Sequence, residues 1–375
     1  MYFEYILRLF YRDSVSSDFQ NSGNVSNLES IFKTLYMKNL KLFAVIAILA
    51  ACSKPKEIAR IEKPTSFFKT TGSVERLDSI INDIIPKGAE IEILASGFEW
   101  SEGPLWLESQ NALIFTDVPM NKVWKWTEKD SLSVYLEPSG YQGDEEGKRE
   151  PGANGLALDQ NGNLILCQHG NRQVARMKST LENPVPDYEA IISAFEGKKF
   201  NSPNDLVIHS KGDIYFTDPP YGLDEWNTKE LDFQGVYRID PSGKLSLQID
   251  SLSRPNGIGL SPDEKTLYVA QSDPEKARYY AFDLDENGNV ISGKVLLDVT
   301  SSVGGDRKGL PDGLKVDKKG NLFATGPGGV LVISPEGRLL GTILTGEGTA
   351  NCGFNSDLSF LYMTADMYLM RIRLN

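Results

Sequence analysis

Six oxygen-bearing side chains recur along the chain at similar spacing. They are Glu102, Asn154, Asn204, Asn256, Asp312 and Asn351. Two are carboxylates, four are carboxamides, and none is lysine, arginine or histidine, so the set offers a ligand only oxygen atoms. Oxygen ligands select hard cations, and a mixed carboxylate and amide set suits Ca²⁺ better than Mg²⁺, which requires tight octahedral geometry. If these side chains converge, we expect them to hold one divalent cation.

Each of the six residues begins a similar stretch of sequence. Three stretches align without a gap: NGLALDQNGNLIL from Asn154, NDLVIHSKGDIYF from Asn204 and DGLKVDKKGNLFA from Asp312. In each, alternating apolar residues are followed by a glycine eight positions after the first residue and then by a second apolar run. This pattern predicts a β-hairpin with the glycine at its turn. Looser copies begin at Glu102, Asn256 and Asn351.

Six copies at intervals of 39 to 56 residues predict an all-β fold. We expect a six-bladed β-propeller with four-stranded blades around a central metal-binding channel. The innermost strand of every blade lines such a channel, so equivalent residues of the repeats face one axis. An open solenoid fits the spacing too, but its end repeats need polar caps that the sequence does not show. Asn-Gly and Asp-Gly are also ordinary turn dipeptides, so any one of these positions alone is consistent with a simple turn.

In its ordered set of motifs, the chain resembles the SMP-30/gluconolactonase/luciferin-regenerating family, including bacterial gluconolactonases, over roughly residues 90–375. The segments that carry the resemblance are SEGPLW, PGANGLALDQNGNLILCQHGNRQVARM, FNSPNDLVIHSKGDIYFTDPPYG, RPNGIGLSPDEKTLYVA and LPDGLKVDKKGNLFA. The resemblance implies a six-bladed propeller with a divalent cation on its axis. It also implies an enzyme that hydrolyses the carboxylic ester bond of a sugar lactone.

The same resemblance implies a role for each repeated polar residue. The implied metal ligands are Glu102, Asn204, Asn256 and Asp312. Asn154 and Asn351 are then left to bind the substrate. Vertebrate-type members of the family have an arginine at the position of Ser202, so we expect this chain to recognise its sugar differently.

Lactone hydrolysis builds negative charge on the former carbonyl oxygen, and a bound Ca²⁺ with an open position stabilises that charge. We expect Asp312 to act as the general base for the attacking water, and the alternative is that it is a ligand only. His169, in LCQHGNR, is expected at a strand end beside the ring, where it would bind substrate or transfer a proton. Its alternative is a structural, hydrogen-bonded role. Zn²⁺, Mn²⁺ and Mg²⁺ are alternatives to Ca²⁺.

Two other functions fit the same residues. A phosphotriesterase or aryl-esterase is one, because the same cation polarises a P=O bond or another ester carbonyl. The other is a non-catalytic propeller that binds a sugar or a protein and uses the cation to hold its blades together.

Composition narrows the choice of partners. The chain has 375 residues, 40% of them hydrophobic, and a net charge of −12. This charge argues against a nucleic-acid partner, which needs clustered lysine and arginine. Of its three cysteines, Cys167 and Cys352 are expected to be unpaired, and we expect a monomer.

The N-terminal part contains a candidate export signal. Residues 37–52, MKNLKLFAVIAILAAC, combine a methionine, two lysines, a short apolar run and small residues before Cys52. The run is too short to span a membrane and resembles a bacterial lipoprotein signal peptide, which predicts export and a lipid on Cys52. The protein would then be anchored to the bilayer on the periplasmic or cell-surface face of a bacterial membrane. We expect residues 1–36 to be an upstream extension that is not translated, 53–88 a tether, and 89–375 the catalytic propeller.

Overall fold

The structure, a computed structural model, describes residues 68–144 and 147–375. The expected upstream extension, the candidate signal peptide with Cys52 and the tether as far as residue 67 lie outside the described residues. None of the helices in the described part of the chain combines the length and the apolar character needed to cross a membrane.

The repeated segments form the predicted hairpins. In the segment from Asn154, β8 (Ala153–Leu158) pairs antiparallel with β9 (Leu164–Gln168), and the equivalent strands pair in the other five repeats. The turn glycines Gly162, Gly212 and Gly320 have positive φ angles of 78°, 100° and 85°, which only glycine adopts without strain.

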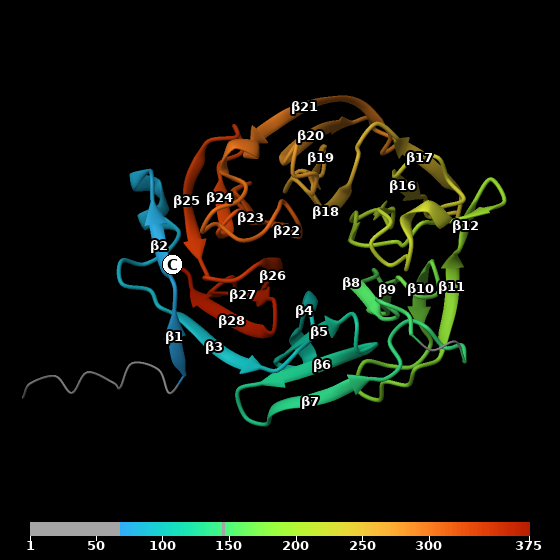
Figure 1. Ribbon diagram of the computed structural model, residues 1–375, viewed down its shortest axis with the longest axis horizontal. Coiled ribbons are helices and arrows are strands. Elements are labelled where there is room, and N and C mark those ends of the chain that lie inside the picture. Colours follow the sequence, from blue (N-terminus) through green and yellow to red (C-terminus); the bar gives the residue numbers. More distant parts are fainter. Residues whose placement is uncertain (1–67, 145–146) are drawn as a thin grey trace, which may run out of the picture. The chain divides into compact units, whose positions relative to one another are not determined.

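Each hairpin is extended outward into a blade, and the six blades are arranged around one centre (Figure 1). Blade 1 contains β4 (Ser101–Leu107), β5 (Ala112–Asp117), β6 (Lys122–Thr127) and β7 (Ser131–Leu136). Blade 2 contains β8, β9, β10 (Gln173–Met177) and β11 (Tyr188–Ile192). Blade 3 contains β14 (Leu206–Ile208), β15 (Ile214–Asp218), β16 (Gly235–Ile239) and β17 (Leu245–Ile249).

The remaining blades follow the same order from the centre outward. Blade 4 contains β18 (Pro255–Leu260), β19 (Thr266–Gln271), β20 (Arg278–Leu284) and β21 (Val290–Asp298). Blade 5 contains β22 (Leu314–Val316), β23 (Leu322–Gly326), β24 (Gly329–Ile333), β25 (Leu339–Leu344) and β2 (Ser73–Arg76). Blade 6 contains β26 (Thr349–Phe354), β27 (Phe360–Ala365), β28 (Tyr368–Arg373), β3 (Ile91–Ser96) and β1 (Lys69–Thr71).

Short elements connect or flank the blades. One small hairpin pairs β12 (Ala194–Phe195) with β13 (Lys198–Lys199). The 3₁₀ helices are η1 (Ser79–Asp83), η2 (Glu108–Gln110), η3 (Trp226–Thr228) and η4 (Thr300–Ser302).

The hydrophobic core is divided among the contacts between neighbouring blades. For example, Ile114 of blade 1 and Leu164 of blade 2 belong to one buried cluster, and other clusters join blades 2 and 3, 3 and 4, 4 and 5, and 5 and 6. A further cluster joins Leu369 of blade 6 to Phe115 of blade 1. The first and last blades therefore pack on each other, which closes the ring and excludes the open solenoid.

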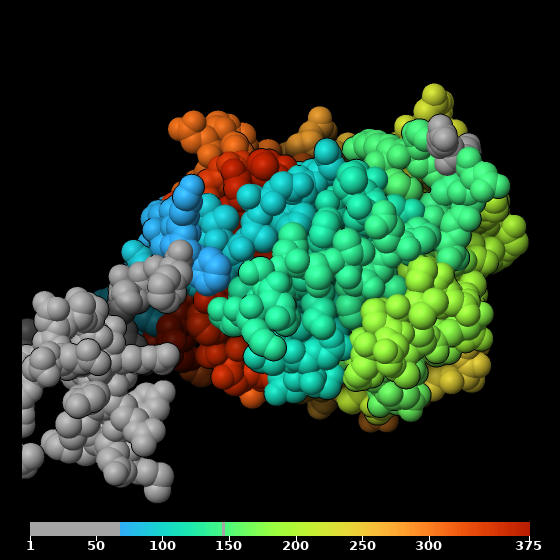
Figure 2. Space-filling view, turned by 90° about the horizontal axis from the view of Figure 1, so that it is seen from below, coloured from blue at the N-terminus to red at the C-terminus, as the bar shows by residue number. Residues whose placement is uncertain are grey.

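The ring is closed by strands from both ends of the described chain. β3 pairs antiparallel with β28, with Ile91 opposite Ile372 and Ser96 opposite Tyr368. Figure 2 shows the blue N-terminal residues against the red C-terminal residues at the side of the propeller. Because blade 6 takes only three strands from the C-terminal end, the last repeat is shorter than the others.

This closure corrects the predicted tether at its C-terminal end. Residues 69–83 are not a linker, because β1 adds to blade 6, β2 adds to blade 5, and η1 packs the buried Ile81 under them. Blades 5 and 6 consequently have five strands rather than the predicted four. β1 is mostly exposed and β2 mostly half-buried, and neither edge strand has an alternating apolar pattern, so their sequence carries no clear strand signal.

Candidate active site

All six repeated polar residues lie within the first residues of the innermost strand of a blade or just before it. Glu102, Asn154, Asn256 and Asn351 fall within β4, β8, β18 and β26, at points where the register of the hairpin shifts by one residue. Such β-bulges redirect a side chain relative to the regular alternation of a strand. Asn204 and Asp312 come two residues before β14 and β22. Bulges therefore accompany four of the six repeated residues, and the hairpins that follow Asn204 and Asp312 keep a regular register.

The glycine that follows most of these residues allows adjacent blades to approach closely at the axis. A β-carbon on Gly257 would lie 2.1 Å from the backbone oxygen of Asp312 in the next blade. A β-carbon on Gly313 would lie 2.0 Å from Cγ of Asn351. Neither Gly257 nor Gly313 needs a positive φ angle. The Asn-Gly and Asp-Gly pairs are therefore close-approach sites between blades rather than turns.

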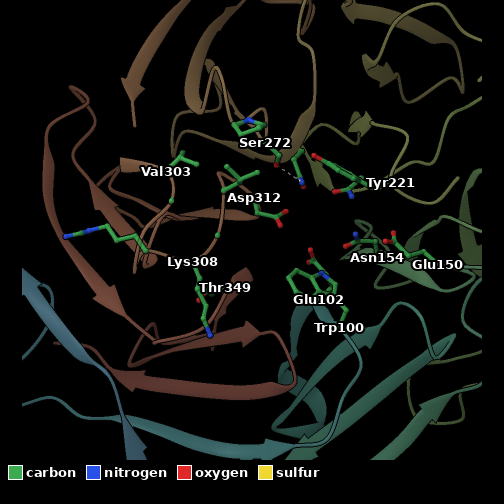
Figure 3. Close-up of a pocket in the computed structure, with 18 of the residues that line it drawn as sticks. Trp100, Glu102, Glu150, Asn154, Tyr221, Ser272, Val303, Lys308, Asp312 and Thr349 are labelled. Carbon is green, nitrogen blue, oxygen red and sulfur yellow. Dashed lines mark hydrogen bonds between the residues drawn. The ribbon is translucent and has the colours of Figure 1, made fainter. Parts of the chain in front are cut away.

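Five of the six residues line one cavity of about 740 Å³ on the axis: Glu102, Asn154, Asn204, Asn256 and Asp312. Figure 3 shows the side chains of Glu102, Asn154 and Asp312 pointing toward a common centre at the floor of this cavity. Asn351 does not line it, and instead donates a hydrogen bond of 3.1 Å from Nδ2 to Oε2 of Glu102. The structure thus brings together all four predicted metal ligands and the predicted substrate residue Asn154.

Burial controls the protonation of the two carboxylates in the cation-free site. The pKa of Glu102 is raised to about 7, chiefly by desolvation and also by the carboxylate of Asp205, while hydrogen bonds from Gly103 and Asn351 and the charge of Lys315 oppose the rise. Desolvation also raises the pKa of Asp312 well above its ordinary value, together with the charges of Glu102 and Asp205, while the Asn256 amide opposes the rise. Both shifts favour the neutral acid when no cation is present.

Asp205 and Lys315 are charged groups near the ring that sequence reasoning missed. Asp205 is buried, and one of its carboxylate oxygens, Oδ2, has no hydrogen-bond partner. Nζ of Lys315 lies 3.3 Å from Oδ1 of Asn351. The carboxylates of Glu102, Asp205 and Asp312 with the ammonium of Lys315 give the site a net charge of −2 when all are ionised. The only sequence signal for Asp205 is its place directly after Asn204.

The four amides differ in their hydrogen bonds. Nδ2 of Asn256 donates to Oγ of Ser272 over 3.0 Å, and Nδ2 of Asn204 lies 3.5 Å from Nε2 of His169. Oδ1 of Asn351 accepts from the backbone nitrogen of Cys352 over 2.9 Å. Oδ1 of Asn154 is buried without a partner.

His169 lies behind the cavity wall rather than in it. Its side chain is fully buried, and Nδ1 is 3.1 Å from Oε2 of Glu150, which lines the cavity. Its predicted roles as catalytic and substrate-binding residue require contact with substrate, and this position does not support such contact. His169 instead joins Glu150 to Asn204.

The residues present fit a divalent cation. Oδ1 of Asp312, one of the predicted ligands, is buried without a hydrogen-bond partner, which is costly unless a bound ligand satisfies it. All donors at the floor are oxygen atoms, and the surrounding charges balance +2. Among the described residues, no three or more His, Cys, Asp or Glu side chains are placed to hold a metal ion together. The predicted ligand set differs from such a group, since it combines two carboxylates with two amides.

The mouth of the cavity mixes aromatic and basic side chains. Trp100 and Tyr221 border it, as do Arg149, Arg307 and Lys308. Each basic group also contacts a carboxylate: Arg149 that of Glu150, Arg307 that of Glu75 and Lys308 that of Glu347. None of these five residues occupies the repeated polar position of a blade.

Comparison with known proteins assigns the chain to a described family. A gluconolactonase from Zymomonas mobilis is 37% identical over 337 residues, which cover 88% of this chain and 93% of that protein. The structure of a gluconolactonase from Xanthomonas campestris matches with a TM-score of 0.71 and 29% identity, over 84% of this chain and 99% of that one. A calcium-binding regucalcin from Agrobacterium tumefaciens, at 17% identity and a TM-score of 0.59 over 75% of this chain and 93% of that one, shares the fold. Residues 100–366 match the family model of the SMP-30/Gluconolactonase/LRE-like region, and the chain belongs to this family.

Proposed function

We propose that the protein is a lactone hydrolase that opens a sugar lactone at a divalent cation, with gluconolactone or a related aldonolactone as substrate. The observation that carries this proposal is the unpartnered Oδ1 of Asp312 at the floor of the axial cavity, beside Glu102 and three amides. The gluconolactonases from Zymomonas mobilis and Xanthomonas campestris support the choice of substrate.

Glu102, Asn204, Asn256 and Asp312 would hold the cation, for which we propose Ca²⁺ because all the donors are oxygen atoms of mixed charge. When bound, the cation supplies Lewis-acid polarisation of the lactone carbonyl and stabilises the charge that develops on its oxygen. Asn154, whose Oδ1 has no partner, is free to accept a hydrogen bond from a substrate hydroxyl.

Asp312 is the proposed general base. Asp312 is one of the two ring carboxylates that line the axial cavity, and a carboxylate placed there can accept a proton from the attacking water. It takes one proton from water as the water oxygen attacks the carbonyl carbon. The bond to the ring oxygen then breaks, the proton passes to that oxygen, and the product is the open hydroxy acid.

The test is lactone hydrolysis by the purified full chain, followed with a pH indicator. We expect turnover of δ-gluconolactone that is lost in chelator and restored by Ca²⁺. Asp312→Asn keeps an oxygen ligand but no base, so we expect kcat to fall by about 10³, while Asp130→Asn, an exposed carboxylate far from the axis, keeps its activity. Cation binding without turnover on any lactone, phosphotriester or aryl ester would instead support a binding propeller.

We further propose that the protein is exported and held to a bilayer through a lipid on Cys52. The support is the sequence of residues 37–52, with its lysines, apolar run and small residues before the cysteine. We also propose that it acts as a monomer, because the six blades close into a ring within one chain.

A further inference from the structure

We propose that His169 and Ser272 are positioning residues that fix the amides of Asn204 and Asn256 with their oxygen atoms toward the cation. This inference rests on the proposed function, because it concerns the same metal centre. It assigns a role to two buried side chains, one of which does not reach the cavity at all.

An amide ligand has an orientation problem that a carboxylate does not have. The oxygen and nitrogen ends of asparagine have nearly the same shape, but only the oxygen binds a cation. If nothing holds the nitrogen, the side chain can turn and present N–H groups to the cation. A hydrogen-bond acceptor placed on the nitrogen side removes this alternative, as outer contacts commonly do for metal ligands.

His169 supplies such an acceptor for Asn204. Nδ1 of His169 is 3.1 Å from Oε2 of Glu150, and an ionised carboxylate only accepts, so Nδ1 carries the hydrogen. In the neutral ring, Nε2 then has a lone pair, and it faces Nδ2 of Asn204 at 3.5 Å. The imidazole has no room to move on one side, because a β-carbon on Gly222 would lie 2.5 Å from Cβ of His169.

Ser272 does the same for Asn256. Its hydroxyl donates to the backbone oxygen of Pro311, so its hydrogen is already used. The oxygen lone pair accepts from Nδ2 of Asn256 over 3.0 Å. Pro311 directly precedes Asp312, so Ser272 links two of the proposed ligands.

The other two amides provide an internal comparison. No hydrogen bond of the Asn154 side chain is found within the described residues, and its oxygen is buried and unpartnered. The oxygen of Asn351 is occupied by the backbone nitrogen of Cys352 and by Lys315. Of the four amides, Asn204 and Asn256 have the nitrogen held by His169 or Ser272 and no hydrogen bond to the oxygen within the described residues. The Asn256 amide also hydrogen-bonds the Asp312 carboxylate, which lies in the same ligand set. These are the two amides that the family resemblance implies as ligands.

The test is a calorimetric titration with Ca²⁺ of the full chain from which a chelator has removed divalent cations. We expect His169→Leu to weaken Ca²⁺ binding about tenfold. His169→Gln places an oxygen acceptor near the position of Nε2, so we expect it to recover most of the lost affinity. In an Asn204→Asp background, where both side-chain ends are oxygen, His169→Leu should change the affinity by less than about threefold.

The same design applies to Ser272. Ser272→Ala should weaken Ca²⁺ binding, and Ser272→Thr, which keeps the hydroxyl, should recover most of the lost affinity. In an Asn256→Asp background, Ser272→Ala should have little effect. Equal losses in the asparagine and aspartate backgrounds, or no loss in either, would overturn the proposal. If His169→Leu does not fold, as judged by circular dichroism, the Ser272 set decides. If wild type binds Ca²⁺ but the variants do not show this pattern of affinities, only the positioning role is contradicted. A wild-type chain that binds no divalent cation defeats both this inference and the cation-dependent function.

Discussion

The backbone oxygen of Asp312 lies only 2.1 Å from the point that a β-carbon on Gly257 would occupy. These two residues belong to neighbouring blades, and each stands at the innermost strand of its own blade or just before it. The contact ties the position of the proposed base to a residue with no functional group. The precision of the site therefore depends on how closely the blades meet at the axis.

Gly257→Ala is expected to disturb the centre without removing any ligand. The new methyl group overlaps a backbone atom that cannot move independently, so we expect the free energy of unfolding to fall by about 2 kcal/mol and Ca²⁺ affinity to fall with it. Chemical denaturation and calorimetry measure the two effects. Gly348→Ala is the stability control, because its β-carbon would have only one neighbour, at 3.7 Å in Trp100. Equal stability of the two variants would contradict the close-approach argument.

Stability without a cation is expected to depend on pH through Glu102. Burial raises its pKa from 4.5 to about 7, so this group favours the folded state below pH 4.5, and its contribution is lost as the pH rises through 7. In chelator, the Tm of wild type should therefore fall relative to that of Glu102→Gln between pH 5 and pH 8. The variant still contains Asp312, whose pKa is also raised. The Tm of Glu102→Gln should therefore also fall with rising pH, but less steeply than that of wild type.

The same linkage predicts the effect of added Ca²⁺. The cation binds the ionised carboxylates, so the increase in Tm at saturating Ca²⁺ should be larger at pH 8 than at pH 5.5. Differential scanning calorimetry at the two pH values measures this. An increase that is larger at pH 5.5 would show that the buried carboxylates are not the ligands.

Arg371 is expected to stabilise the closure of the ring. Its guanidinium binds Glu92 of the N-terminal strand β3 over 2.5 Å and also Glu128 of blade 1, and it lies over the rings of Phe68, Trp126 and Phe360. Removing the buried guanidinium leaves the partly buried Glu92 without its partner and removes the contacts with the three rings, so Arg371→Gln should cost about 2 kcal/mol. The exposed Arg373 is a matched control on the same strand, and Arg373→Gln should change stability by about 0.5 kcal/mol or less. Chemical denaturation distinguishes them, and similar losses would contradict a special role for Arg371.

The repeat pattern was sufficient to predict the blades and the convergence of the ring. Hairpin periodicity, turn glycines such as Gly162 and one polar residue per repeat are local features, and each is visible in the sequence. The closing strand β3 and the added strands β1 and β2 were not recognised, because pairing between Ile91 and Ile372 joins opposite ends of the chain and leaves no local pattern. Exposed edge strands also lack the apolar alternation on which strand prediction depends.

The site was predictable in its ligand types but not in its supporting contacts. Nothing local indicates that Ser272 contacts Asn256 or that His169 lies behind Asn204, since each pair is brought together from different blades or strands. Asp205 and Lys315 affect the charge of the centre, yet neither occupies the repeated position. Sequence reasoning placed His169 near the ring, and its burial could be learned only from the packing of the Gly222 loop against it.

Export through Cys52 is expected to be testable in cells. Cys52→Ser should abolish labelling by fatty acid and release the protein from the membrane fraction, while Cys167→Ser should leave both unchanged. Intact-mass measurement of the unprocessed chain should give a start at Met37. Continued acylation of Cys52→Ser, or a chain that begins at Met1, would contradict this part of the proposal.

The most direct measurement is a crystal structure of the full chain after chelation and reloading with Ca²⁺. We predict one cation on the axis, about 2.3–2.6 Å from oxygen atoms of Glu102, Asn204, Asn256 and Asp312. A Ca²⁺-saturated protein with no cation among these four side chains, and with lactone hydrolysis that persists in chelator, would contradict the account.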